Sequence, residues 1–223
     1  MKKVIIYGAG SYGKQFFYEA DRYGKIDIEA FTMDMKFITN FKECGLPVVP
    51  FEEIDQIYPP EKYDMIVLCG YLVMRNRLLM YKKAKEKGYA LINYISPHAF
   101  LENEITMGEN NIILTDAVIG YDGIMGNGNI ICPKVYLGHQ FVVEDHSIIS
   151  AGCVLGGNCR IGSLVFIGIG VTARDHIIYG DECLVGMGSN VVKNVKPYST
   201  VWGNPAEISN FHEETGVIIG KAK

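Results

Sequence analysis

Excess positive charge, paired cysteines and long apolar runs are all missing from this sequence, and each absence excludes a class of protein. Lysine and arginine total 21 against 25 acidic residues, so the net charge is −4. This balance argues against nucleic acid or an anionic membrane surface as a partner. No run approaches the ~18 apolar residues of a membrane span. The six cysteines contain no C-x-x-C pair, the usual signature of a cysteine metal or redox site.

We also expect no secretory signal, although the first residues resemble one. Lys2 and Lys3 precede an apolar stretch at residues 4–7, but Gly8 and the polar Ser11 interrupt it too early for a signal peptide. We therefore expect a cytoplasmic protein. With 223 residues, 48% of them hydrophobic and 21% charged, the composition is that of a soluble globular protein with one large or two small domains.

The most regular feature is a repeat of six residues between Leu101 and Val191. Fourteen of the sixteen residues at this spacing are Leu, Ile, Val or Met, and glycine follows nine of the sixteen. A period of six is typical of a solenoid of short parallel strands, in which the apolar side chains stack in an inward column. Cys153, Cys159 and Cys183 share another phase of the repeat, which predicts small core residues.

This pattern closely resembles the hexapeptide repeat of left-handed parallel β-helix acyltransferases. The resemblance implies three faces, eighteen residues per coil and about five coils over this stretch. A purely structural or metal-binding β-helix is the alternative. His146 and His176 are thirty residues apart, which is not a whole number of coils, and His139 lies in a different phase. We therefore expect no metal within one chain, although partner chains leave a zinc site open.

Residues 1–95 have a different pattern, in which short apolar segments alternate with amphipathic ones. The segments expected as strands are 4–7, 26–31, 64–69 and 89–95, and those expected as helices are 14–23 and 72–87. This alternation predicts a small parallel sheet with helices on its faces, a Rossmann-like α/β domain.

A glycine-rich loop follows the first expected strand. Gly8 permits a tight turn, Gly10 lets a phosphate approach the backbone, and Gly13 allows close packing of helix and strand. Asp34, 21 residues after Gly13, stands where an acid that binds ribose is expected. Four strands without a second mononucleotide half argue against NAD. We expect a nucleotide-sugar diphosphate, and the alternative is a loop kept only for its turn.

The two parts in this order, joined by residues 95–99, resemble bacterial sugar acetyltransferases of the sialic acid O-acetyltransferase type. These include N-acetyltransferases acting on nucleotide-linked amino-sugars of the bacillosamine and perosamine kind. The resemblance implies an N-terminal domain that holds the nucleotide sugar, and a homotrimer with acetyl-CoA bound between neighbouring subunits. Residues 201–206 resemble the segment that ends the helix in this family. We expect domains at 1–95 and 96–206 and a tail at 207–223.

Acetyl transfer from a thioester needs a general base and a donor for the oxyanion. The resemblance places the base at His139, with Gln140 where the family has a carboxylate, and it places the oxyanion amide at Gly157. With eighteen residues per coil, His139 stacks between Tyr121 and Gly157. Asp122, one coil before Gln140, is a candidate for the missing charge. The alternative for His139 is a solvated turn residue.

The expected cofactor is acetyl-CoA, used as a co-substrate. Its pantetheine arm is expected to pass Gly157, Ile169, Gly170, Met187 and Gly188. The expected reaction is N-acetylation of the sugar by direct attack on the thioester, and O-acetylation stays open.

Departures from the family pattern leave a third possibility, a non-catalytic scaffold that binds nucleotide sugars. The family's carboxylate is Gln140 here, its frequent second histidine is Ile148, and its common asparagine is Cys132.

Overall fold

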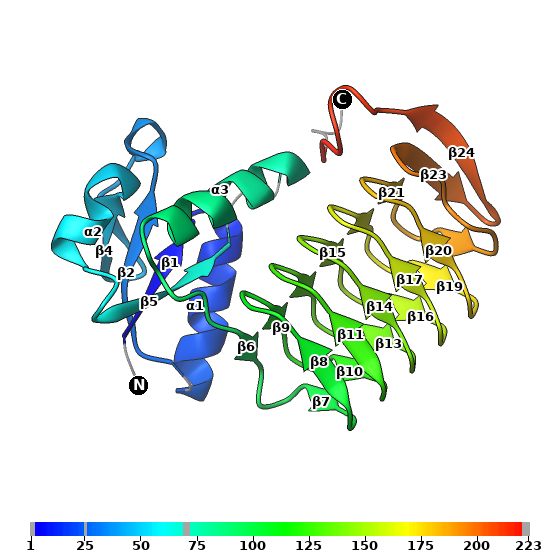
Figure 1. The fold of residues 1–223 in the computed structure, drawn as a ribbon, viewed down its shortest axis with the longest axis horizontal. Helices are drawn as coiled ribbons and strands as arrows, with labels where there is room; N and C mark the ends of the chain where they lie inside the picture. Colours follow the sequence, from blue (N-terminus) through cyan, green and yellow to red (C-terminus); the bar gives the residue numbers. More distant parts are fainter. Residues whose placement is uncertain (1–2, 25, 69–71, 220–223) are drawn as a thin grey trace. The chain divides into compact units, whose positions relative to one another are not determined.

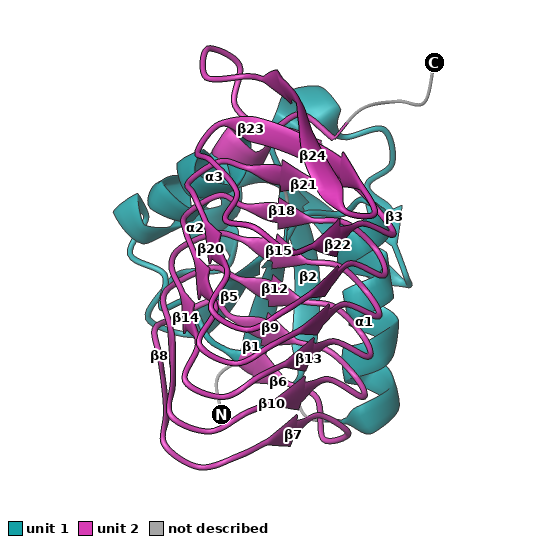
Figure 2. Ribbon diagram, turned by 90° about the vertical axis from the view of Figure 1, so that its right-hand side faces the viewer, with its two compact units in different colours: residues 1–71, 76–93 teal, residues 72–75, 94–223 magenta. Residues whose placement is uncertain are grey.

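The structure, a computed structural model, describes residues 3–24, 26–68 and 72–219 (Figure 1). The chain divides into two compact units, which Figure 2 colours separately. The first unit comprises residues 1–71 and 76–93, and the second comprises residues 72–75 and 94–223. No helix among the described residues is long and apolar enough to cross a membrane.

The first unit contains a five-stranded sheet with the order β3-β4-β2-β1-β5. Strands β4, β2, β1 and β5 are parallel, and β3 pairs antiparallel with β4. Its elements are β1 (Lys3–Tyr7), α1 (Ser11–Tyr23), β2 (Ile28–Met33), η1 (Met35–Phe37), β3 (Lys42–Glu43), β4 (Leu46–Pro50), η2 (Phe51–Glu53), α2 (Ile54–Ile57), β5 (Tyr63–Val67) and α3, which spans Met74–Glu86 and includes two residues of the second unit.

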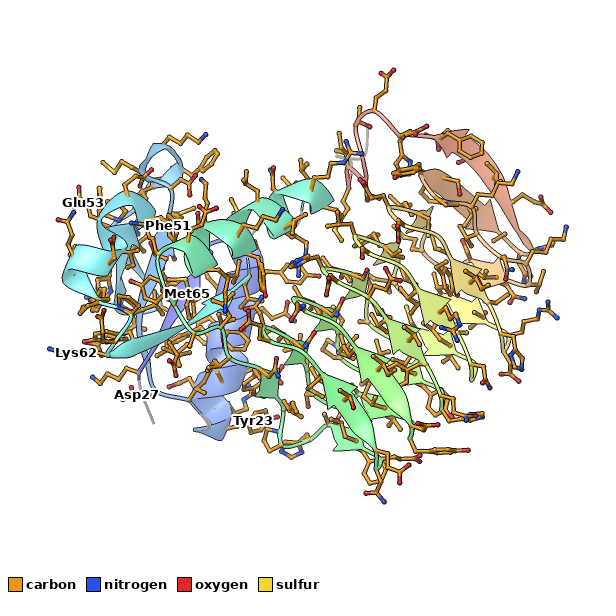
Figure 3. The ribbon with its side chains drawn as sticks, in the orientation of Figure 1. Tyr23, Asp27, Phe51, Glu53, Lys62 and Met65 are labelled. Atoms are coloured by element: carbon orange, nitrogen blue, oxygen red, sulfur yellow. The ribbon has the colours of Figure 1, made fainter. Side chains whose placement is uncertain are left out.

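Continuous apolar runs explain the parallel strands of this unit. Four of the five residues of β1 are buried, as expected for a strand covered on both faces. Figure 3 labels the buried Phe51 and Met65 and, by contrast, the exposed Glu53 and Lys62. Phe51 stacks on Tyr7 with ring centroids 4.2 Å apart, so this core extends to the carboxyl end of β1.

The sequence prediction for this unit is wrong at its end. Residues 89–95 were expected to form a fourth parallel strand, but only Leu91 forms a bridge, to Met65. The next two residues with strand pairing, Tyr94 and Ile95, belong to the second unit. The β3–β4 hairpin was not predicted, and the expected strand end at residue 69 lies outside the described residues.

The second unit is a left-handed parallel β-helix with three faces. The β6 face contains β6 (Tyr94–Ile95), β9 (Ile112–Ile113), β12 (Ile130–Ile131), β15 (Ile148–Ile149), β18 (Phe166–Ile167), β21 (Leu184–Val185), β23 (Ser199–Gly203) and β24 (Ala206–Phe211). The β7 face contains β7 (Phe100–Leu101), β10 (Val118–Ile119), β13 (Tyr136–Leu137), β16 (Val154–Leu155), β19 (Thr172–Ala173) and β22 (Asn190–Val191). The β8 face contains β8 (Ile105–Met107), β11 (Gly123–Met125), β14 (Val142–Val143), β17 (Arg160–Ile161) and β20 (Ile178–Tyr179).

Strand pairing confirms the coil of eighteen residues. Ile119 pairs with Leu137 and Leu137 pairs with Leu155, and the same step recurs on the other two faces. In Figure 2 the strands of the β6 face follow one another as a ladder. The inward column from Ile113 to Val191 is a single core, in which the three repeat cysteines are fully buried. The predicted role of these cysteines as small core residues is therefore confirmed.

The end of the helix departs from the eighteen-residue step. Leu184 pairs with Thr200, sixteen residues on, and β23 then turns back into the antiparallel β24. The expected tail at 207–223 is therefore in part a strand, and the last strand of the β6 face carries exposed side chains such as Phe211.

Candidate functional site

His139 lies on an edge of the β-helix, in the turn that leads from β13 on the β7 face to β14 on the β8 face. We call this edge the His139 edge; it comprises residues 102–104, 120–122, 138–140, 156–158 and 174–176. The imidazole stacks on the ring of Tyr121, with centroids 5.3 Å apart and planes 13° from parallel. On the other side, a Cβ atom placed on Gly157 would lie 2.7 Å from Nε2 of His139. The predicted stack of these three residues is present.

The nitrogen Nδ1 of His139 is buried and has no hydrogen-bond partner among the described residues. Gln140, which stands where the family has a carboxylate, donates from Nε2 to Oδ2 of Asp122 at 3.2 Å. Gln140 and Asp122 are therefore joined to each other, as their eighteen-residue spacing suggested, and neither makes a hydrogen bond to His139. Among the described residues no carboxylate bonds to Nδ1, and the imidazole is stacked between Tyr121 and Gly157.

The backbone amide of Gly157 already has an acceptor. It donates to Oδ1 of Asp175, one coil further on, at 3.0 Å. The family resemblance placed this amide toward a thioester carbonyl, and in this structure it faces the Asp175 carboxylate instead. An oxyanion at Gly157 would first have to displace that carboxylate.

Ile169, Gly170, Met187 and Gly188 lie on a second edge, between the β6 and β7 faces. We call it the Met187 edge; it comprises residues 132–134, 150–152, 168–170 and 186–188. Ile169 and Met187 stack one coil apart and are 61% and 70% exposed, so the edge offers an apolar strip. The amides of Gly170 and Gly188 donate to the carbonyls of the preceding coil, at 3.0 and 2.8 Å. A ligand on this edge would therefore bind to backbone carbonyls and side chains rather than to these two amides.

The two edges border the same face of the helix, the β7 face, from opposite sides. One chain therefore does not bring His139 and Met187 together, and the residues predicted for catalysis and for acetyl-CoA fall into two half-sites.

The glycine loop of the first unit borders a separate cavity of about 260 Å³. Gly8 has a φ of 133°, which a side chain would strain, and its amide donates to the carbonyl of Thr32. A Cβ atom on Gly13 would lie 1.8 Å from the Gly8 carbonyl oxygen, whereas nothing lies within 4 Å of one on Gly10. The roles predicted for the turn at Gly8, the open backbone at Gly10 and the close packing at Gly13 agree with this geometry.

The start of α1 is suited to an anion. Gly10 caps the helix without a side-chain hydrogen bond, and no acidic residue lies in the first turn. Ser11 and Lys14 line the cavity beside it, and Lys14 forms an ion pair with Glu43 at 2.8 Å. Lys14 is thus a cation in the first turn of α1, and its charge is paired with that of Glu43.

Asp34 has a structural role that its spacing did not reveal. Its Oδ1 accepts a hydrogen bond from the Tyr7 hydroxyl and its Oδ2 accepts one from Nζ of Lys83 at 3.1 Å. Burial raises the pKa of this carboxyl, but the hydrogen bonds from Tyr7 and Lys83 outweigh burial, so the pKa lies below its usual value. Asp34 does not line the cavity, and both of its oxygens are already engaged.

The cavity is lined instead by residues that the sequence analysis did not single out: Phe37, Thr39, Asn40 and Glu43, together with Met33 and Ala9. Phe37 is 52% exposed and could serve as a platform for a flat ring. For Phe37, Thr39 and Asn40 the signal in the sequence was position alone. They follow β2, and ligands of parallel sheets bind beyond the carboxyl ends of the strands.

The cysteines of the helix offer no nucleophile. Burial raises the pKa of the Cys153 thiol to about 11, and it raises that of Cys183 as well. Cys132, which stands where the family has an asparagine, is only 5% exposed. Direct attack on a thioester therefore agrees better with this chain than an acyl-enzyme.

No protein-family model matches the chain. Among curated proteins, the acyl-[acyl-carrier-protein]–UDP-N-acetylglucosamine O-acyltransferase of Pseudomonas paraeruginosa is 33% identical over 111 residues. That of Ectopseudomonas mendocina is 32% identical over 112 residues. Each match covers 50% of this chain, and the chain spans only 36% of the length of these relatives.

Solved structures resemble the chain over both units. The acetyltransferase domain of PglB from Neisseria gonorrhoeae is 26% identical with a TM-score of 0.85, covering 94% of this chain and 100% of that one. The same domain in complex with acetyl coenzyme A gives a TM-score of 0.84, 26% identity, and 93% and 99% coverage. A mutant of perosamine N-acetyltransferase from Caulobacter crescentus, in complex with CoA and GDP-perosamine, gives 0.85 at 22% identity, covering 94% and 98%.

These likenesses define the class by fold, a β-helix of the acyltransferase kind preceded by a smaller α/β unit. The curated relatives and the structural neighbours named above are acyltransferases, and two of the three neighbour structures contain CoA or acetyl-CoA.

Proposed function

We propose that the protein is an acetyltransferase that moves an acetyl group from acetyl-CoA to the amino group of a nucleotide-linked sugar. The observation that carries this proposal is the likeness over 94% of the chain, both units included, to the acetyltransferase domain of PglB. The neighbour solved with CoA and GDP-perosamine supports an amino-sugar nucleotide as the acceptor. Of the two acceptor groups, this favours the amine.

His139 is the proposed general base. As the amine nitrogen attacks the thioester carbonyl, a C–N bond forms and Nε2 of His139 takes the proton. The tetrahedral intermediate then expels the CoA thiolate, which takes that proton back from the imidazolium as the C–S bond breaks. If the Gly157 amide stabilises the oxyanion, it must first leave Asp175.

A homotrimer would complete the site from the two half-sites. The His139 and Met187 edges border the β7 face, so a ring of three copies with this face toward the three-fold axis sets one edge beside the other edge of the next copy. Phe100, Tyr136 and Val154 point outward from the β7 face and are 60%, 44% and 47% exposed. Such a row of exposed apolar side chains suits burial between identical copies.

The nucleotide part of the acceptor is proposed to bind at the glycine loop of the first, Rossmann-like unit. The diphosphate would lie at the start of α1 beside Ser11 and Lys14, and a base or ribose would lie against Phe37, Thr39 and Asn40. Because Asp34 is held by Tyr7 and Lys83, we no longer assign the ribose contact to it.

The decisive experiment is thioester consumption with a panel of UDP-, GDP- and dTDP-linked amino-sugars and the matching hydroxyl sugars. Turnover is expected only with the amino-sugars. His139→Ala should lower kcat by about 10²–10⁴-fold, the contribution of a general base, and leave acetyl-CoA affinity unchanged in calorimetry. Full activity of this variant would contradict the base assignment.

Two alternatives have their own outcomes in this assay. Turnover with hydroxyl acceptors alone would indicate an O-acetyltransferase; transfer of an acyl group to an oxygen of a UDP-sugar is the activity named for the curated relatives. Binding of nucleotide sugars without turnover of any would indicate a scaffold, for which the occupied Gly157 amide and the missing carboxylate partner of His139 are the arguments.

A further inference from the structure

The imidazole of His139 lacks the partner that usually fixes a catalytic histidine. A base is normally held in one orientation by a hydrogen bond from its second nitrogen to a carboxylate or a carbonyl. Here Nδ1 has no such bond among the described residues, and the nearby Gln140 and Asp122 are bonded to each other. Something else must keep Nε2 directed toward a reacting group.

Tyr121 is the side chain in position to do this. Its ring covers one face of the imidazole at 5.3 Å and 13°, an offset-stacked geometry that aromatic rings favour. The opposite face of the imidazole lies over Gly157, where even one added carbon would come within 2.7 Å of the ring. The imidazole is thus held between an aromatic ring and a stretch of bare backbone.

The backbone of Tyr121 is itself fixed. Its amide donates to Oε2 of Glu102 at 3.0 Å, and its carbonyl accepts from the amide of Gln140 at 2.8 Å. Tyr121 also lines a cavity of about 520 Å³, together with Phe100, Leu101 and Glu102. The ring therefore separates the imidazole from an open space. Its removal would join that space to the imidazole.

We propose that Tyr121 is a positioning residue for His139, in place of the missing carboxylate. The proposal rests on the proposed function, in which His139 is the base. A positioning role differs from a packing role in one measurable respect. Removal of the Tyr121 ring should lower the rate only when the His139 imidazole is present. A displacement of a catalytic group by about 1 Å can cost about 10²-fold in rate, which sets the scale of the effect.

The test compares Tyr121→Phe, Tyr121→Leu and Tyr121→Ala with the wild type, each also in the His139→Ala background. Tyr121→Phe keeps the ring and should retain activity within about twofold of the wild type. Tyr121→Leu and Tyr121→Ala should lower kcat by about 10- to 100-fold with the KM for acetyl-CoA unchanged. In the His139→Ala background the same changes should have no further effect, because residues that act as a unit are not additive.

Phe211→Ala is the matched control, since it removes an exposed ring from β24 and should leave kcat unchanged. A second readout is the proton NMR resonance of the His139 ring at Cε1, which the stacked tyrosine shifts upfield. Tyr121→Leu should remove that shift in a folded protein of unchanged assembly.

These outcomes distinguish a failure of the His139 assignment from a failure of the inference about Tyr121. Full activity of His139→Ala would overturn the assignment of His139 as the base in the proposed function, and the inference with it. A strong effect of His139→Ala together with no effect of Tyr121→Leu would overturn the inference alone. So would an equal loss from Tyr121→Leu in both backgrounds, because the ring would then act through something other than the imidazole.

Discussion

For single residues of this chain, the spacing in the sequence predicts which residues stack in one column but not which side chains form hydrogen bonds. Spacing placed His139 correctly between Tyr121 and Gly157, because a coil of fixed length puts every eighteenth residue in one column. Spacing did not reveal that Asp175 accepts the hydrogen bond of the Gly157 amide, or that Tyr7 and Lys83 hold Asp34. Side-chain partners depend on rotamers and on neighbours from other elements, and no periodic pattern encodes these.

At the residue scale we predict that Asp34 stabilises the first unit in a pH-dependent way. Asp34→Asn should reduce the free energy of unfolding by about 1.5–3 kcal/mol at neutral pH, the range for hydrogen bonds to charged groups. Because hydrogen bonds from Tyr7 and Lys83 lower its folded-state pKa, this contribution is complete above the unfolded-state pKa. It is lost as the pH falls through the folded-state value.

Urea unfolding followed by the helical circular dichroism signal measures this difference. The gap between wild type and Asp34→Asn should narrow as the pH is lowered from about 5 toward about 2. The control is Asp21→Asn, at an exposed position on α1. A gap that does not change with pH would show that the charge of Asp34 is not what stabilises the fold.

At the scale of elements, the β-helix was predictable and the first unit only partly so. Each coil repeats the same contacts with the coils beside it. The six-residue period was therefore sufficient to predict the three faces, the strand register and the burial of the cysteines. The β3 strand has two residues and leaves no periodic trace. Residues 89–95 have the apolar character of a strand, but they contribute only a bridge at Leu91 before the chain enters the β-helix.

A polar ladder inside the helix gives the prediction at this scale. Asn129 is fully buried and donates from Nδ2 to Oδ1 of Asn111 at 3.2 Å and to the Glu144 carbonyl at 2.7 Å. Its Oδ1 accepts from the amide of Ser147 at 2.8 Å. Asn129→Ala would leave the Ser147 amide and the Glu144 carbonyl without these partners, whereas Oδ1 of Asn111 would keep the backbone amide of residue 129, which donates to it at 3.1 Å. Each buried group left without a partner costs about 1–3 kcal/mol.

Hydrogen exchange is the measurement for this variant. The amide of Ser147 should exchange faster in Asn129→Ala, and the melting temperature should fall, whereas Thr106→Ala at an exposed position of β8 should change neither. Unchanged protection at Ser147 would show that the ladder does not hold neighbouring coils together.

At the scale of the whole molecule, the arrangement of the two half-sites predicts where copies of the chain meet. A charge at the centre of the β7 face should break the proposed trimer, because burying an unpaired carboxylate between subunits is costly. Val154→Glu is therefore expected to give a monomer without acetyl transfer. Ile124→Glu, a change of the same kind at a 56% exposed position on the β8 face, should leave the trimer and the activity intact.

Light scattering at micromolar concentration, combined with the thioester assay, distinguishes these variants. If Val154→Glu stays trimeric and active while Ile124→Glu dissociates, the β8 face is the interface. A monomeric wild type with full activity would remove the shared site altogether.

The constant step between paired strands also limits how the length of such a chain can change during evolution. Because Leu137 stacks on Ile119 and under Leu155, duplication of eighteen residues adds one coil and leaves every later side chain on its own face. An insertion of six residues between His139 and Ile169 keeps the apolar period but rotates all that follows by one face. Ile169 and Met187 would then move to the edge that carries His139. A gene for this fold can therefore gain or lose whole coils of eighteen residues while its two half-sites stay on separate edges. Insertions or deletions of six residues would place the two half-sites on the same edge or move one of them to a different edge.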